Sequence, residues 1–164
     1  MGVTAKDFWG KFLNLLPLLI LFFISLNGSS VVNIKFFSIN IHYILVYFWV
    51  LRHPQSLGYG FIFLSGIIND VVFGLPLGIN ALSLLVIAGV AAYVRVVTVR
   101  ITLVNDWIGF IPALLIANFV YFLSLYFSSY SIEYLLLFKN SVSTFIFYPI
   151  LWLVFSFILN FSRS

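Results

Sequence analysis

The chain lacks cysteine and has very few charged residues. Its 164 residues include 0 cysteines, 1 methionine and 2 histidines, and only 7% are Asp, Glu, Lys or Arg. The absence of cysteine excludes disulfide bonds, thiolate metal sites and cysteine nucleophiles. Soluble domains carry about 25% charged residues, so a chain with so few cannot cover itself with a water-compatible surface.

Apolar and aromatic side chains take the place of the missing charges. Hydrophobic residues make up 63% of the chain and aromatic residues 20%. We therefore predict a single integral membrane domain over residues 1–164, folded as an all-α bundle in the lipid bilayer. The net charge of +4 does not indicate nucleic-acid binding. The basic residues stand singly at the ends of apolar runs, where they anchor helices and set topology.

The apolar runs predict six membrane segments. A helix needs about 20 apolar residues to cross the ~30 Å hydrocarbon core. On this basis the segments lie at about residues 10–27, 36–52, 58–73, 77–95, 107–128 and 140–160. The first segment also resembles a signal peptide, with Gly28 and Ser30 as small residues at a cleavage site. Cleavage there would leave five segments.

The basic residues predict the orientation of the chain. With the N-terminus inside, most of them fall on the cytoplasmic side, as the positive-inside tendency requires. The inner set is Lys6, Lys11, Arg52, Arg95, Arg100 and Arg163, and the outer set is Lys35 and Lys139. Both termini are therefore expected in the cytoplasm.

One acid stands inside an apolar stretch, beside a bend. Asp70 precedes the sequence Gly74-Leu75-Pro76-Leu77-Gly78. Glycine permits the positive φ angles of a sharp turn, and Pro76 cannot continue a helix. A charge at this depth costs about 2.5–3.5 kcal/mol, so Asp70 needs a compensating role. It either clamps the hairpin by accepting N–H groups of the turn or of the next helix, or faces a cavity and binds a proton, an ion or a partner group.

Small residues along the third and fourth segments indicate close helix packing. They are Gly58, Gly60, Ser65, Gly66, Ala88, Gly89, Ala91 and Ala92. In the fifth segment, Asn118 is expected to form a hydrogen bond to a neighbouring helix, since an amide in hydrocarbon needs a partner.

The chain shows no catalytic constellation. It contains no H-E-x-x-H motif, Walker loop or dinucleotide fingerprint. An aspartyl protease needs two carboxylates that share a proton, but the predicted topology places Asp70 toward the outer leaflet and Asp106 at the cytoplasmic boundary. We therefore predict a protein that is not an enzyme and holds no cofactor or metal.

A series of short motifs runs from residue 43 to residue 82. It contains Tyr47-Phe48-Trp49, His53-Pro54, Gly58, Gly60-Phe61, Gly66, Asp70, Gly74, Leu77-Gly78 and Ala81-Leu82. In this order and approximate spacing the motifs resemble the family of rod-shape-determining MreD proteins. The most specific part is the pattern G-x-x-x-D-x-x-x-G-x-x-L-G together with the upstream His-Pro turn.

The resemblance implies a fold, a location and a set of partners. It implies a non-enzymatic scaffold in the bacterial inner membrane that supports rod shape and peptidoglycan synthesis. The direct partner would be the bitopic protein MreC, which links it to MreB filaments and to the peptidoglycan transpeptidase and glycosyltransferase. The fold would be similar to the six-helix substrate-binding components of energy-coupling-factor transporters. The chain departs from some relatives at Asn118, where they carry an acid.

These considerations select ten residues with a structural or partner-binding role. They are Pro54, Gly58, Gly60, Gly66, Asp70, Gly74, Pro76, Gly78, Gly89 and Asn118. We expect the MreC helix to dock on the small-residue faces of the third and fourth helices. Two alternatives stay open. One is a small-molecule-binding component of a transporter, with Ala88 and Ala92 against a coupling subunit. The other is an ion conduit, which a single buried acid supports least.

Overall fold

The described part of the chain is a helical bundle with one small β-hairpin. The computed structural model describes residues 5–34, 37–98, 102–130 and 133–163. Helix accounts for 80% of the structure. The elements in chain order are α1 (Ala5–Leu26), β1 (Val31–Ile34), β2 (Phe37–Asn40), α2 (Ile41–Arg52), α3 (Tyr59–Phe73), α4 (Ile79–Val97), α5 (Leu103–Phe127) and α6 (Tyr134–Arg163).

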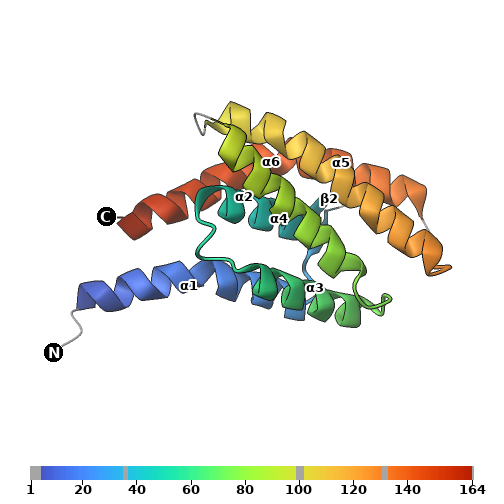
Figure 1. The fold of residues 1–164 in the computed structure, drawn as a ribbon, viewed down its shortest axis with the longest axis horizontal. Coiled ribbons are helices and arrows are strands. Elements are labelled where there is room, and N and C mark those ends of the chain that lie inside the picture. The colour runs from blue at the N-terminus through green and yellow to red at the C-terminus, as the bar shows by residue number, and fades with distance from the viewer. Residues whose placement is uncertain (1–4, 35–36, 99–101, 131–132, 164) are drawn as a thin grey trace.

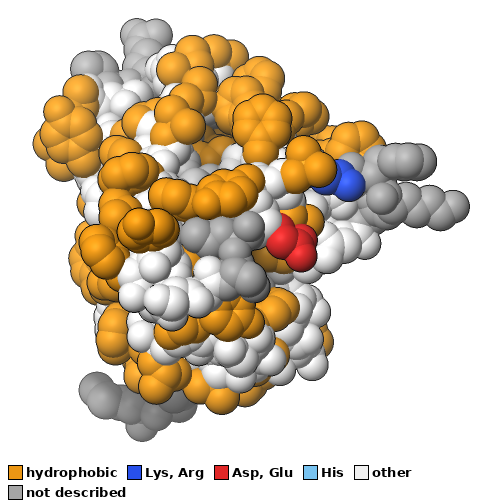
Figure 2. Space-filling model, turned by 90° about the vertical axis from the view of Figure 1, so that its right-hand side faces the viewer, with side chains coloured by type: hydrophobic (Ala, Val, Ile, Leu, Met, Phe, Trp, Pro, Cys, Tyr) orange, Lys and Arg blue, Asp and Glu red, His pale blue; other side chains and the backbone are white. Residues whose placement is uncertain are grey.

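Within the described residues, three helices are long and apolar enough to cross a membrane. These are α4, α5 and α6, while α2, α3 and the described apolar part of α1, Leu15–Leu26, are shorter. On the face shown in Figure 2, hydrophobic side chains cover much of the described surface, with few charged groups between them. Such a surface is stable in lipid rather than in water, so length, composition and surface together indicate a membrane protein.

The chain ends lie at the same end of the bundle. The start of α1 and the end of α6 are both at the left of Figure 1, together with the α2–α3 connection, the end of α4 and the start of α5. The α3–α4 connection, the end of α5 and the start of α6 lie at the other end. The bundle therefore has two distinct ends: one where α1 begins and α6 ends, and one that carries the α3–α4 bend.

Helix α2 forms the centre of the bundle. All of its residues from His42 to Leu51 are buried, as expected for a helix that is covered on every side. Aromatic rings connect it to the outer helices. The ring centroid of Tyr47 lies 5.0 Å from that of Phe110 in α5, and that of Trp49 lies 4.8 Å from that of Phe155 in α6.

The predicted second segment, residues 36–52, is not helical throughout its described part. Residues 37–40 pair with 31–34 in an antiparallel ladder, and the helix starts only at Ile41. Asn40 ends the strand and caps the helix, because its side-chain oxygen accepts the N–H of Tyr43 at 3.1 Å. Hydropathy alone does not separate a short apolar strand from a helix. Position 36 lies outside the described residues.

Helices α3 and α4 touch backbone to backbone at Gly66. A Cβ atom on Gly66 would lie 2.6 Å from the backbone nitrogen of Ala81 and 2.9 Å from its Cβ. Gly60 and Gly89 have open space instead, with nothing within 4 Å of such an atom. The small residues therefore divide into two groups. Gly66 packs inside the bundle, whereas Gly60 and Gly89 lie on its exposed surface.

Substitution of these glycines by alanine separates the two groups. Gly66→Ala should destabilise the protein by about 1–3 kcal/mol, because the methyl group meets rigid backbone. Gly89→Ala is the matched control. It should be neutral or stabilise the protein by up to about 1 kcal/mol, since alanine is the better helix former. Thermal unfolding in mild detergent measures both effects, and equal unfolding temperatures for the two variants would contradict the packing.

Candidate functional site

The carboxylate of Asp70 closes the bend between α3 and α4. Its Oδ2 accepts the backbone N–H of Gly78 at 2.8 Å. Its Oδ1 accepts the backbone N–H and the side-chain amide of Asn80, each at 2.9 Å. Asp70 belongs to α3 and is fully buried. Its carboxylate lies at the N-terminus of α4, where the helix dipole favours an anion. This is the arrangement that the clamp interpretation expects.

Two glycines give the bend its backbone path. Gly74 ends α3 with φ +64°, and Gly78 precedes α4 with φ +104°. Both angles lie in the left-handed region, which glycine enters without a steric penalty. The backbone oxygen of Asp70 accepts the N–H of Leu75 at 2.9 Å, so Asp70 binds the bend through its backbone as well as its side chain. Pro76 lies between the two glycines, where no helix needs its N–H.

Asn80 is the member of this site that the sequence analysis missed. Its side chain lies in the first turn of α4 and donates to Asp70. A signal was present in the sequence, because a buried carboxylate needs donors and Asn80 is the first polar side chain after the bend. Only the fold, however, places it within hydrogen-bond distance.

The other predicted residues lie in different parts of the bundle. Gly58 is the residue before the first turn of α3, and Pro54 lies in the α2–α3 connection, so both are at the opposite end of α3 from the hairpin. The amide of Asn118 donates to the hydroxyl of Ser141 at 3.0 Å and links α5 to α6, as predicted. The structure thus brings Gly66, Asp70, Gly74, Pro76 and Gly78 together at or near the α3–α4 bend and its helix contact, and leaves the remaining five away from the bend.

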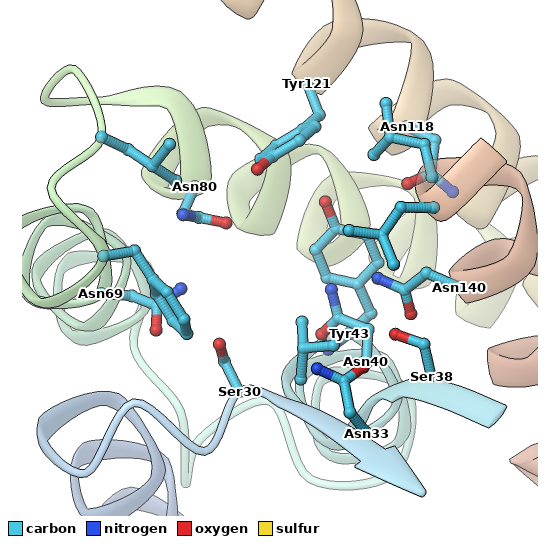
Figure 3. A pocket seen from close by; sticks show the side chains of 15 residues that line it. Ser30, Asn33, Ser38, Asn40, Tyr43, Asn69, Asn80, Asn118, Tyr121 and Asn140 are labelled. Carbon is cyan, nitrogen blue, oxygen red and sulfur yellow. The ribbon is translucent and has the colours of Figure 1, made fainter. Parts of the chain in front are cut away.

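A polar cavity of about 260 Å³ lies beside the hairpin (Figure 3). Its polar lining combines amides and hydroxyls from the β-hairpin and five helices or their ends: Ser30, Asn33, Ser38, Asn40, Tyr43, Asn69, Asn80, Asn118, Tyr121 and Asn140. Apolar residues complete it: Val31, Phe73, Leu75, Leu136 and Leu137. Asp70 is not among the lining residues and reaches the cavity only through Asn80.

The second buried acid lies at the end of the bundle that carries the termini. Asp106 Oδ2 is 2.9 Å from the guanidinium of Arg52 and accepts the indole N–H of Trp152 at 2.8 Å. The guanidinium also lies over the Trp152 ring, 5.1 Å from its centroid. These contacts join α2, α5 and α6. Asp106 lies in the first turn of α5 and Asp70 near the end of α3, and Figure 1 shows the start of α5 and the end of α3 at opposite ends of the bundle.

The described residues form no metal-binding constellation. Within them, no group of three or more His, Cys, Asp or Glu side chains is placed to hold a metal ion. Comparison with known proteins identifies no relative, since no family model, curated protein or solved structure matches the chain. Function therefore has to be inferred from the hairpin, the cavity and the helix surfaces.

Replacement of Asp70 tests the clamp. Because both carboxylate oxygens accept backbone N–H groups, Asp70→Asn turns an NH₂ group toward one of these donors and leaves that donor unsatisfied. We expect a loss of about 1–3 kcal/mol of stability, and a larger loss for Asp70→Ala, which removes all three hydrogen bonds. Asn80→Ala, which removes one side-chain bond, should cost about 1 kcal/mol. Thermal unfolding in detergent would contradict the clamp if Asp70→Asn matched the parent protein.

A double-mutant cycle tests the ion pair. Arg52→Gln leaves the Asp106 carboxylate buried without a cation, which should cost about 3 kcal/mol. Adding Asp106→Asn to that variant should restore part of the loss, because the uncompensated charge is removed. The measurement is the unfolding temperature of the two single variants and the double variant. Simple addition of the two single losses would show that the groups do not interact.

Proposed function

We propose that the protein is an MreD-like, non-enzymatic scaffold of the cell-elongation machinery in a bacterial inner membrane. In this proposal it binds a bitopic MreC-like protein, and through that partner it supports MreB filaments and the peptidoglycan transpeptidase and glycosyltransferase. The observation that carries the proposal is the α3–α4 hairpin, in which four positions of the motif G-x-x-x-D-x-x-x-G-x-x-L-G have a definite structural role.

The four positions act together to build one joint. Gly66 permits contact with Ala81, Asp70 clamps the bend, and Gly74 and Gly78 adopt the left-handed backbone. A motif that specifies a joint rather than a reactive group fits a protein that works through its shape. It also explains why an acid is kept in an apolar chain without a catalytic partner.

Leu77, the remaining position of the motif, has no such role within the fold. Its side chain is 69% exposed at the tip of the bend, where it contributes little to the bundle's own packing. An apolar side chain that a motif specifies and the fold leaves exposed is a reasonable contact for a partner. We therefore place the MreC-like partner at the hairpin tip and along the exposed face of α4 around Gly89.

The proposed topology has six membrane segments with both termini in the cytoplasm and a fold like that of energy-coupling-factor substrate-binding components. The common position of the chain ends (Figure 1) supports it. The 12 residues of α2 span only about 18 Å. In this proposal the preceding β-hairpin completes the path, shielded by the surrounding helices as irregular backbone in a membrane must be.

Two rival functions fit the structure less well. A transporter component would contact its coupling subunit through Ala88 and Ala92, but Ala88 is completely buried in the core. An ion conduit needs a relay of ionisable groups. The two acids buried in the described residues both have partners: Asp70 accepts hydrogen bonds from three N–H donors, and Asp106 forms an ion pair with Arg52. They lie at opposite ends of the bundle, so they form no relay.

Co-purification with the MreC-like protein of the same organism tests the proposal. Leu77→Asn and Gly89→Leu should each reduce the recovered partner severalfold, because both change the proposed contact surface, while the unfolding temperature stays within about 2 °C of the parent. Leu135→Asn is the matched control, an exposed leucine outside this surface. The same variants should be scored for rod shape in cells. Undiminished partner recovery with both test variants would refute the docking surface, and no recovery with the parent protein would refute the scaffold function.

A further inference from the structure

We infer that the polar cavity beside the hairpin is a binding site for an uncharged group rich in hydroxyl or amide functions. The group is about the size of one sugar ring, and either a free molecule or a lipid headgroup carries it. This site does not depend on the scaffold proposal, because it rests on the chemistry of the cavity wall alone.

Three buried polar atoms of the wall have no hydrogen-bond partner within the protein. They are the hydroxyl oxygens of Ser30 and Ser38 and the side-chain oxygen of Asn69. Each of these residues is only 2% exposed. Leaving a buried polar atom unpaired costs stability. Three of the seven such atoms in the described residues meet at the wall of this one cavity, and a local cost of this kind is typical of a functional site. The three atoms therefore indicate a ligand that supplies hydrogen bonds.

Other amides of the wall are held in fixed orientations. The amide nitrogen of Asn80 donates to Asp70, and that of Asn118 donates to Ser141. In each case the side-chain oxygen is left as an acceptor, and Figure 3 shows the oxygen of Asn80 directed into the cavity. Preorganised groups of this kind favour binding, since they lose little freedom when a ligand arrives. The free oxygens of Asn80 and Asn118 favour hydroxyl and N–H donors. The oxygens of Asn40 and Asn140 already accept hydrogen bonds from Tyr43 and Thr144, so these two amides offer their NH₂ groups as donors, and the wall suits a group that both donates and accepts.

The wall selects against charge. Its described lining contains no Asp, Glu, Lys, Arg or His, so neither an anion nor a cation would find a compensating partner there, and burying an unpaired charge is costly. The carboxylate of Asp70 lies directly behind Asn80 and disfavours anions further. The ligand is therefore uncharged where it enters the cavity.

Size and shape narrow the ligand to a single ring or its equivalent. At about 260 Å³ the cavity is slightly smaller than the 300 Å³ or more of pockets for drug-sized molecules. Tyr43 and Tyr121 supply ring faces and hydroxyls (Figure 3). Phe73 and Leu136 line the cavity and are also exposed, which provides an apolar path for the acyl chains of a lipid whose headgroup occupies the site.

Ligand-induced stabilisation tests the site. The full-length protein is placed in phosphatidylcholine nanodiscs, and its unfolding temperature is recorded with glucose, with N-acetylglucosamine or with monoglucosyl diacylglycerol in the disc. A ligand that binds only the folded state raises this temperature. We expect a concentration-dependent rise with at least one of these probes and none with inorganic phosphate. A rise with the free sugars assigns the site to a soluble molecule, and a rise with the glycolipid alone assigns it to a headgroup.

Matched variants show whether the cavity is responsible. Ser38→Ala and Asn69→Leu each remove an unpaired atom from the wall and should raise the apparent dissociation constant about tenfold, the effect of one lost hydrogen bond. Ser38→Ala should unfold no earlier than the parent without probe, since its hydroxyl has no partner to lose. Ser156→Ala is the control, because Ser156 also has an unpaired buried hydroxyl but lies outside the cavity. It should bind like the parent.

Three results would overturn the inference. No rise with any sugar probe means that the cavity holds water only. An equal rise in the parent, Ser38→Ala and Asn69→Leu proteins places the binding elsewhere. A rise with phosphate as large as that with the sugars contradicts selection for an uncharged group. None of these results bears on MreC co-purification, so the binding site and the scaffold function are tested independently.

Discussion

The hydrogen bonds accepted by the Asp70 carboxylate are the interaction on which the rest of this structure depends. A sharp bend between two apolar helices exposes N–H groups that lipid cannot satisfy. Asp70 accepts two of them, from Gly78 and Asn80, and so fixes where α4 begins. With that start fixed, Gly66 meets Ala81 in the α3–α4 contact. The same clamp holds the amide of Asn80 in the cavity wall and leaves the bend itself at the surface.

The bundle contains two buried acids, one at each end, and compensates each in a different way. Asp70 is compensated by neutral N–H donors, whereas Asp106 is compensated by the Arg52 cation and the Trp152 indole. The first arrangement brings no cation to the hairpin end, where the described lining of the cavity also carries no charged side chain. The second ties α2, α5 and α6 together where the chain ends lie. Between the two ends the core is aromatic and aliphatic, so the acids act as separate structural joints.

Much of the hairpin could be predicted from the sequence, because its determinants are local. The positive φ angles of Gly74 and Gly78, the break at Pro76 and the acceptor role of Asp70 all involve residues within ten positions of one another. Long-range partners were less accessible. The Arg52–Asp106 pair joins residues 54 positions apart. The strand at 37–40 was missed because its partner strand, rather than its own composition, stabilises it.

The sequence by itself determined that this is an apolar, cysteine-free helical chain with an acid at a glycine-rich bend, since composition and local backbone preference set those properties. Tertiary structure alone decided which small residues are buried: Gly66 lies against Ala81 while Gly89 faces outward, although the two look equivalent in sequence. It also decided that residues from the β-hairpin and distant helices meet around one cavity. The reason is physical. Hydropathy records how apolar a segment is, whereas burial and hydrogen bonding depend on which segments pack together.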